Sequence, residues 1–135
     1  MVTRKQFSLP PDDLAFLGEL GMTWECVLEG TTMWVIIHEF EVPAQYSVSA
    51  VSVALQLPQN YPDAQIDMAY FFPAVDRADG TPIRQIANQS LDGKTWQRWS
   101  RHRTNANPWR TGVDCLETHI LLVREWLERE VRGAA

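Results

Sequence analysis

The sequence predicts an α+β domain, in which a short helix precedes a β-sheet and a longer helix closes the chain. Three observations lead to this prediction: consecutive strand-like runs, a long polar stretch after them, and one strongly periodic helix near the end. The 135 residues, 45% of them hydrophobic and 21% charged, are ordinary for one globular domain. We therefore expect a single domain over residues 11–132, after a flexible N-terminal segment, residues 1–10.

The first element is a short helix that begins near Pro11. Asp12 and Asp13 follow this proline, and proline and acidic residues are both favoured in the first helical turn. Leu20 closes the apolar pattern, and Gly21 is a suitable stop. The sequence therefore predicts a helix of only a few turns.

Four strand-like runs come next and predict an antiparallel meander. They are rich in β-branched and aromatic residues or alternate between apolar and polar residues. The expected strands cover residues 23–28, 32–40, 47–57 and 66–72. A corner with two prolines, residues 58–63, separates the last two strands, because proline and the residue before it resist helix formation.

Residues 76–107 are long, polar and without a sustained period. We expect a long irregular loop here, and such loops are usually functional or poorly ordered. Trp96 and Trp99 lie within it, and their large rings need a surface to pack on.

The C-terminal helix has the clearest pattern. Thr111 and Asp114 have the spacing of a capping box, so the helix is expected to start at Thr111 and to end near Arg132. Two adjoining stripes at helical spacing predict that it packs across the sheet. The first stripe is Val113, Leu116, Ile120, Val123 and Leu127, and the second is Cys115, His119, Leu122 and Trp126.

Composition excludes several classes of function. A net charge of −5 argues against general nucleic-acid binding, because phosphates repel an acidic surface. No apolar run is long enough for a membrane span, and the start has no secretory pattern. Two cysteines are too few for a disulfide framework, so we expect a cytoplasmic protein. Scattered histidines and the lack of a glycine-rich phosphate loop predict no metal and no cofactor.

One basic segment departs from this acidic balance. Residues 94–110 hold five Lys/Arg and no acid, which suggests a docking surface for an acidic partner. Tryptophan and arginine dominate interface hot spots, so the candidate partner-binding residues are Trp96, Trp99, Arg101, Arg103, Trp109 and Arg110. The alternatives are a solvated loop with self-compensating charge and tryptophans that cover the sheet.

Three motifs carry a resemblance to a known family. Residues 57–62 read Leu-Pro-Gln-Asn-Tyr-Pro, residues 72–73 read Phe-Pro, and residues 107–110 read Asn-Pro-Trp-Arg before a helix. They are similar to the Tyr-Pro corner, the His-Pro-Asn site and the tryptophan of ubiquitin-conjugating (UBC-fold) domains. From Pro11 to Glu130 the chain resembles the bacterial form called prokaryotic family E, which implies a UBC-like fold.

The chain departs from this family at two chemical positions. In active members the thioester-forming cysteine stands about eight residues before the tryptophan, and that position is Arg101 here. The asparagine of the family's His-Pro-Asn is Ala74, and no cysteine lies between Cys26 and Cys115. We therefore expect a member that lacks the usual catalytic cysteine.

The resemblance implies a ubiquitin-like modifier, often with tandem domains, a ThiF-type activating enzyme and a JAB-type protease, in systems linked with antiphage defence. We favour a non-catalytic protein that binds the modifier and its activating enzyme. The alternatives are an active acyl carrier with an unusual nucleophile and an unrelated binding module that shares only the α+β outline.

Cys115, Ser100 and His102 are the candidate catalytic residues. Thiolates are favoured at helix N-termini, and His119 lies one turn after Cys115, so the two could form a Cys–His pair. The alternative is a buried apolar cysteine beside a buried histidine. An open groove at Cys115 beside the tip of the meander would mean an error of register and would overturn the non-catalytic interpretation.

Ser100 and His102 occupy the stretch of the family's nucleophile, flanked by Arg101 and Arg103, which could bind a carboxylate. The alternative is a docking loop without chemistry. His38, in an apolar strand, is expected to be a hydrogen-bonded strand residue.

Overall fold

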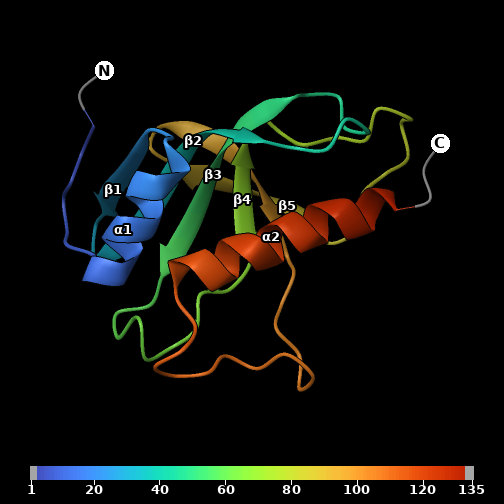
Figure 1. Cartoon of the computed structure of the whole chain (residues 1–135). Helices are drawn as coiled ribbons and strands as arrows, with labels where there is room; N and C mark the ends of the chain where they lie inside the picture. The colour runs from blue at the N-terminus through green and yellow to red at the C-terminus, as the bar shows by residue number, and fades with distance from the viewer. Residues whose placement is uncertain (1–2, 133–135) are drawn as a thin grey trace.

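The computed structural model describes residues 3–132, which form one antiparallel sheet with two helices on the same face (Figure 1). The elements are α1 (Pro11–Leu20), β1 (Trp24–Glu29), β2 (Thr32–Glu41), β3 (Ala50–Leu57), β4 (Ala69–Phe72), β5 (Ile86–Leu91), β6 (Lys94–Trp99) and α2 (Leu116–Val131). The strand order is β1-β2-β3-β4-β6-β5. The α+β prediction, with a first helix, a meander and a last helix that packs on the sheet, is confirmed. Among residues 3–132, neither helix has the length and apolar character that crossing a bilayer requires.

The prediction of a four-stranded sheet followed by an irregular loop was wrong, because the sheet has six strands. The β5–β6 hairpin lies inside residues 76–107, where the polar side chains of an exposed strand hid the pattern. Asp92 and Gly93 form its turn with φ of 54° and 72°, as a two-residue hairpin turn requires. The Asp-Gly dipeptide was the available signal.

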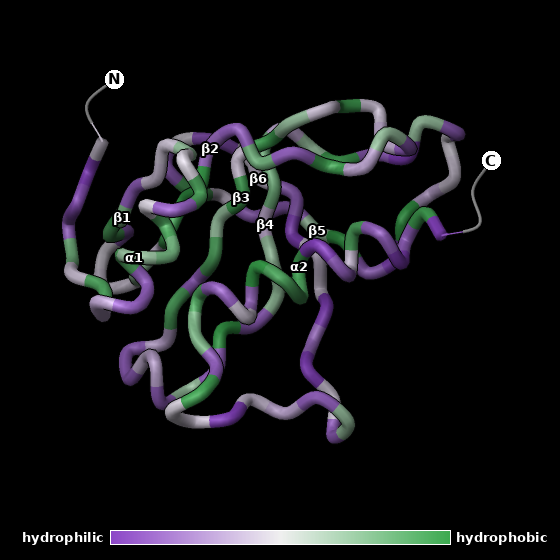
Figure 2. The backbone as a smooth tube through the Cα atoms, in the orientation of Figure 1, coloured by the Kyte–Doolittle hydropathy of each residue, from purple (hydrophilic) through white to green (hydrophobic). Residues whose placement is uncertain are grey.

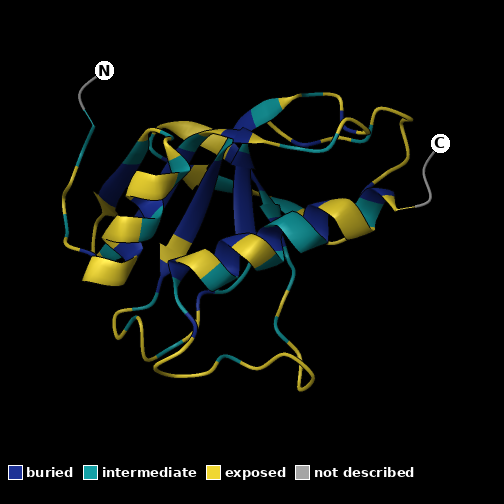
Figure 3. Ribbon diagram, viewed as in Figure 1, coloured by how far each residue is buried: buried dark blue, intermediate teal, exposed yellow. Residues whose placement is uncertain are grey.

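The sheet has a hydrophobic core on each face, and its central strands β3 and β4 are largely buried (Figure 3). The larger core lies between the sheet and the two helices. The smaller core lies on the opposite face and consists of Val27, Trp34, Ile36, Ala54, Tyr70, Leu91 and Trp96. The sheet is curled, so that the β5–β6 turn at one end of the strand order lies against β1 at the other. The amide of Asp92 donates to Glu29 Oε1 at 3.0 Å.

Residues 4–6 run beside β1 and are bonded to its backbone. The Cys26 amide donates to the Arg4 carbonyl at 2.8 Å, and the Gln6 amide donates to the Cys26 carbonyl at 2.9 Å. Arg4 also pairs with Glu25 at 3.0 Å and with Asp92 at 2.7 Å, so one side chain joins β1 to the hairpin turn. Flexibility of residues 1–10 stays a prediction for hydrogen exchange to check.

Helix α2 starts four residues later than the capping-box spacing predicts. Its N-cap is Cys115, whose amide donates to Thr118 Oγ1 at 2.9 Å. Thr111 is not the cap, because Asp114 accepts the Arg110 amide at 2.6 Å and closes a separate turn. The predicted apolar face is buried from Leu116 onward, whereas Val113 is 57% exposed.

Candidate functional site

Most predicted site residues lie in the connecting loop, residues 100–115, which links β6 to α2. In the view of Figure 1 the loop lies below the sheet and α2, and most of its residues are hydrophilic (Figure 2). Its start is bonded to the residue just before β4, because the Met68 amide donates to the Arg101 carbonyl at 3.2 Å. The loop borders two hollows, one against α2 and one at Cys115.

Arg101 is an anchor inside the structure. Its guanidinium donates to the carbonyls of Arg84 at 3.0 Å and Gln85 at 3.4 Å, and its Nη2 lies 3.3 Å from Glu130 Oε1. The guanidinium also lies 4.8 Å from the ring centroid of Trp99. These contacts attach the loop to the residues just before β5 and to the end of α2. Because the guanidinium is already bonded inside the structure, little of it is available to a partner's carboxylate.

Arg103 is also turned inward, with a side chain only 4% exposed. Its guanidinium lies 5.0 Å from the centroid of Trp109 and 3.9 Å from Asp114 Oδ2. Trp109 in turn donates its indole N–H to the Pro62 carbonyl at 3.0 Å. Arg103 and Trp109 therefore hold the loop against the Tyr-Pro corner.

Trp96 and Trp99 are core residues, 2% and 0% exposed. They belong to opposite faces of the sheet, and each indole N–H is satisfied internally, by the Leu91 carbonyl and by Gln97 Oε1. A partner that docks on the surface does not reach them. Of the six candidate partner residues, Arg110 has the freest side chain, at 63% exposed.

The basic segment does not form one surface. Lys94 lies at the hairpin, 5.5 Å from the ring centroid of Phe72, and Arg101 and Arg103 are committed to internal contacts. Arg110 reaches Asp114 at 3.4 Å. The alternative of self-compensating charge therefore describes much of this segment.

Ser100 and His102 do not form a pair. His102 Nδ1 lies 2.9 Å from both carboxylate oxygens of Asp67, and its side chain is 59% exposed. Ser100 donates its amide to the Gln85 carbonyl at 2.9 Å, and no bond joins it to His102 among the hydrogen bonds of residues 3–132. An activated serine would require His102 to leave Asp67.

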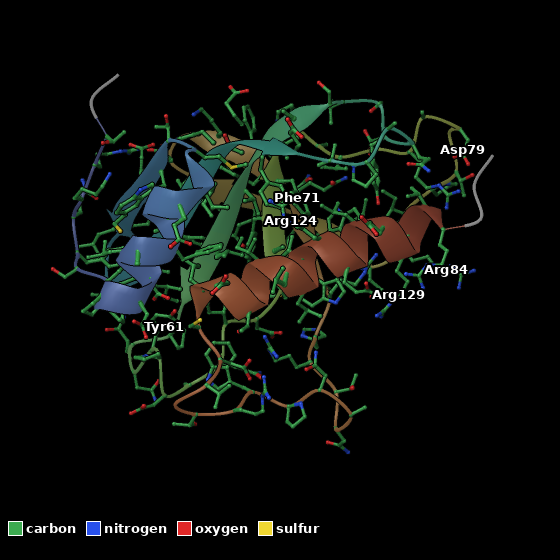
Figure 4. All side chains as sticks on the ribbon, in the orientation of Figure 1. Tyr61, Phe71, Asp79, Arg84, Arg124 and Arg129 are labelled. Carbon is green, nitrogen blue, oxygen red and sulfur yellow. The ribbon has the colours of Figure 1, made fainter. Side chains whose placement is uncertain are left out.

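The α2 groove is the hollow, of about 290 Å³, that the loop forms with the last turns of α2. It is lined by Arg101, His102, Trp126, Arg129 and Glu130. Arg129 is 61% exposed and lies near the C-terminal end of the helix (Figure 4). The sequence reasoning missed Arg129 and Asp67, although Arg129 follows Trp126 at helical spacing.

Cys115 lines the second hollow, of about 150 Å³, between the start of α1, the Tyr-Pro corner and the end of the loop. Its lining is Pro10, Asp12, Asp13, Pro62, Asp63, Gly112, Val113, Asp114 and Cys115. Cys115 is half-buried and forms no disulfide with Cys26. No strand residue lines this hollow, and its charged lining residues are four aspartates without a cation.

The predicted Cys–His pair is not formed. His119 is 0% exposed, and its Nε2 donates to the Met68 carbonyl at 2.9 Å. Burial lowers the pKa of His119 to about 4, so its ring is neutral near pH 7. His119 is therefore the buried histidine of the alternative interpretation, and it does not act as a base for Cys115.

A buried carboxylate joins the two helices beside this hollow. Asp13, 1% exposed, accepts the Tyr61 hydroxyl at 2.5 Å and the Leu116 amide at 3.2 Å. Burial raises the pKa of Asp13 above its ordinary value. The carboxylate caps α2 from α1, and sequence reasoning missed this role, although Asp13 shares a helix face with buried Leu17.

His38 is a hydrogen-bonded strand residue, as predicted: its Nε2 lies 2.9 Å from Glu25 Oε2 and its Nδ1 lies 2.7 Å from Ser52 Oγ. Among residues 3–132, no three His, Cys, Asp or Glu side chains are grouped so that they could hold a metal ion.

Comparison with protein families gives a match over most of the chain. The model of Prokaryotic E2 family E matches residues 9–130, which include both helices up to Glu130 and all six strands. Searches of curated proteins and of solved structures found no match.

Proposed function

Because the chain belongs to prokaryotic E2 family E, a UBC-fold family with a role in ubiquitin-like conjugation, we propose that it binds a ubiquitin-like modifier and its activating enzyme without carrying the modifier at the usual position. The setting proposed is a bacterial pathway with a ThiF-type activating enzyme and a JAB-type protease, used in antiphage defence. Family membership removes the reading of an unrelated module that shares only the outline.

The main support for this proposal is the residue at the position of the family's nucleophile. Arg101 stands there, held by Arg84, Gln85 and Glu130, so no thiol is available and the side chain cannot swing aside without loss of those bonds. Ala74 stands where the family's asparagine would steady an oxyanion. A chain with neither group is suited to holding partners rather than to thioester transfer.

The α2 groove supports a contact for the modifier's acidic groups. Arg129 and His102 present exposed polar atoms on its two sides, and Arg110 lies farther along the loop. Cations that are partly exposed steer and orient an acidic partner. The partner residues proposed are therefore Arg129, His102 and Arg110, without Trp109, which holds the loop, and without the two buried tryptophans.

An adduct assay tests the absence of transfer. The protein is mixed with the modifier and activating enzyme encoded beside it and with ATP, and its mass is measured. Binding without an added modifier mass is the expected outcome. A thiol-labile adduct would contradict the proposal.

A matched pair of charge reversals tests the groove. Arg129 and Arg132 are 61% and 64% exposed and both approach Glu125, but only Arg129 lines the groove. Arg129→Glu should weaken modifier binding roughly tenfold, as about 1.4 kcal/mol implies, in calorimetric titration. Arg132→Glu should leave it nearly unchanged, and equal effects would remove the groove from the proposal.

A second candidate is an acyl carrier that uses Cys115, which the hollow beside this residue favours. It predicts a thiol-labile adduct that disappears in Cys115→Ala. A thiol-resistant, base-labile adduct that disappears in Ser100→Ala would instead indicate an oxyester on Ser100, with His102 released from Asp67 as its base.

A further inference from the structure

Strand β5 is an open edge of the sheet. The strand order places β1 and β5 at the two edges, and residues 4–6 cover β1 through backbone hydrogen bonds. Nothing comparable covers β5 among the backbone contacts of residues 3–132. Within the described part of the chain, β5 is therefore the edge that remains free to pair with another strand.

The β5 edge has none of the usual protections against pairing. Residues 86–91 read Ile-Ala-Asn-Gln-Ser-Leu, with no charge and no proline. The β5–β6 register is continuous, without a bulge, and Ile86 is 40% exposed. Natural edge strands usually carry charges, prolines or bulges that prevent association, so this edge is unusually permissive.

The hairpin turn determines which backbone groups point outward. Leu91 pairs with Lys94 across a two-residue turn, and such flanking residues exchange both backbone hydrogen bonds. Along β5, Leu91 and every second residue before it therefore point their N–H and C=O groups toward β6. The residues between them point these groups away from β6. These outward residues are Ile86, Asn88 and Ser90.

We propose that two copies of this chain pair through β5, antiparallel, about a two-fold axis at Asn88. In this register Asn88 faces Asn88, and Ile86 of each copy faces Ser90 of the other. All three outward positions then meet outward positions, and each such pair can exchange two backbone hydrogen bonds.

Charge complementarity favours this antiparallel, self-paired arrangement. Arg84 precedes β5, and Asp92, which also bonds Arg4, follows it, so antiparallel pairing places Arg84 of each copy at the register position opposite Asp92 of the other. Parallel pairing would bring Arg84 toward Arg84. A self-complementary patch is also what a two-fold dimer requires, and an uncharged edge repels neither copy. This inference does not depend on the proposed function.

Analytical ultracentrifugation tests the dimer. A single edge strand buries less than the roughly 1,200 Å² of a stable complex, so we expect weak association. The weight-average mass should rise from that of the 15.5 kDa monomer toward twice that value between about 10 µM and about 1 mM. A protein that stays monomeric at the upper concentration overturns the proposal.

A matched pair of lysine variants tests the edge itself. Asn88→Lys places two like charges at the axis and should abolish the mass increase. Thr95→Lys adds the same charge to exposed Thr95 of β6, opposite Ser90 in the same hairpin, and should leave association within about twofold of the original. Equal loss in both variants, or none in Asn88→Lys, overturns the register.

Asn88→Pro provides a second test without added charge. It removes an outward N–H and leaves the β5–β6 ladder intact, because proline is tolerated where the N–H faces solvent on an edge. This variant should stay monomeric with an unchanged circular dichroism spectrum. A folded Asn88→Pro protein that still dimerises overturns the proposal.

Discussion

Arg101 is a residue whose role could be identified only from the structure. The sequence indicated an exposed cation for a partner's carboxylate, because it places Arg101 in a polar, basic stretch. Its contacts with Arg84, Gln85 and Glu130 come from distant parts of the chain. Charge alone therefore could not separate an anchor from a docking residue.

Arg101→Glu should destabilise the fold rather than only weaken binding. The new carboxylate would face Glu130, and two carbonyls would lose their donor. We expect the free energy of unfolding to fall by about 2–4 kcal/mol, measured by urea denaturation. Arg110→Glu is the control, since Arg110 is 63% exposed, and should cost no more than about 1 kcal/mol. Equal costs would contradict the anchor role.

The chemistry of the candidate site was harder to predict than the positions of its residues. Cys115, Ser100 and His102 all lie in the connecting loop, but neither expected pair forms. His119 instead bonds the Met68 carbonyl, and His102 pairs with Asp67. Both partners lie just before β4, and no local spacing reveals a contact between segments so far apart in the sequence.

At the scale of elements, periodic patterns were reliable and polar elements were not. Helix α2 and strands β1 to β4 have apolar patterns that burial requires, and their positions were predicted. The β5–β6 hairpin was missed because its strands are half-exposed and carry Asn, Gln and Ser. The start of α2 was misplaced because Asp114 caps a preceding turn, which uses the same residue types as a helix cap.

The hairpin turn gives a test of element stability. Gly93 has φ of 72°, and no atom lies within 4 Å of the place that a Cβ would occupy, so Gly93→Val would cause backbone strain without a clash. We expect a loss of about 1–2 kcal/mol, because left-handed backbone is costly for other residues, measured by thermal unfolding. Gly18→Val, in helix α1 and also with open space, is the comparison, and an equal or larger loss there would contradict the assignment of strain to the turn.

At the scale of the whole molecule, Arg4 joins the two edges of the curled sheet. It bonds Glu25 on β1 and Asp92 in the hairpin turn, and the smaller core lies on the face inside this curl. Hydrogen bonds from Arg4 lower the pKa of Glu25 to about 2, from an ordinary 4.5. The ionised carboxylate is thus favoured in the folded state.

This shift predicts how stability depends on pH. A lowered folded-state pKa gives stability that is complete above about pH 4.5 and is lost as the pH falls through about 2. Since Arg4 is 34% exposed, solvent screening reduces the contribution to on the order of 2 kcal/mol. Glu25→Gln should remove this contribution to the free energy of unfolding at pH 7. It should also flatten the acid limb, which is the fall in that free energy at low pH, measured by urea unfolding at a series of pH values. Glu19→Gln, at an exposed position, should change neither, and an unaltered acid limb in Glu25→Gln would refute the clamp.

The position of this clamp has a practical consequence for handling the protein. Arg4 closes the curled sheet, whereas Arg129 and Glu130 line the groove at the last turns of α2. A bulky label attached beside Arg4 would strain the closure of the sheet, whereas one attached beside Arg129 would crowd the groove. The site of attachment therefore decides whether an assay perturbs thermostability or recognition.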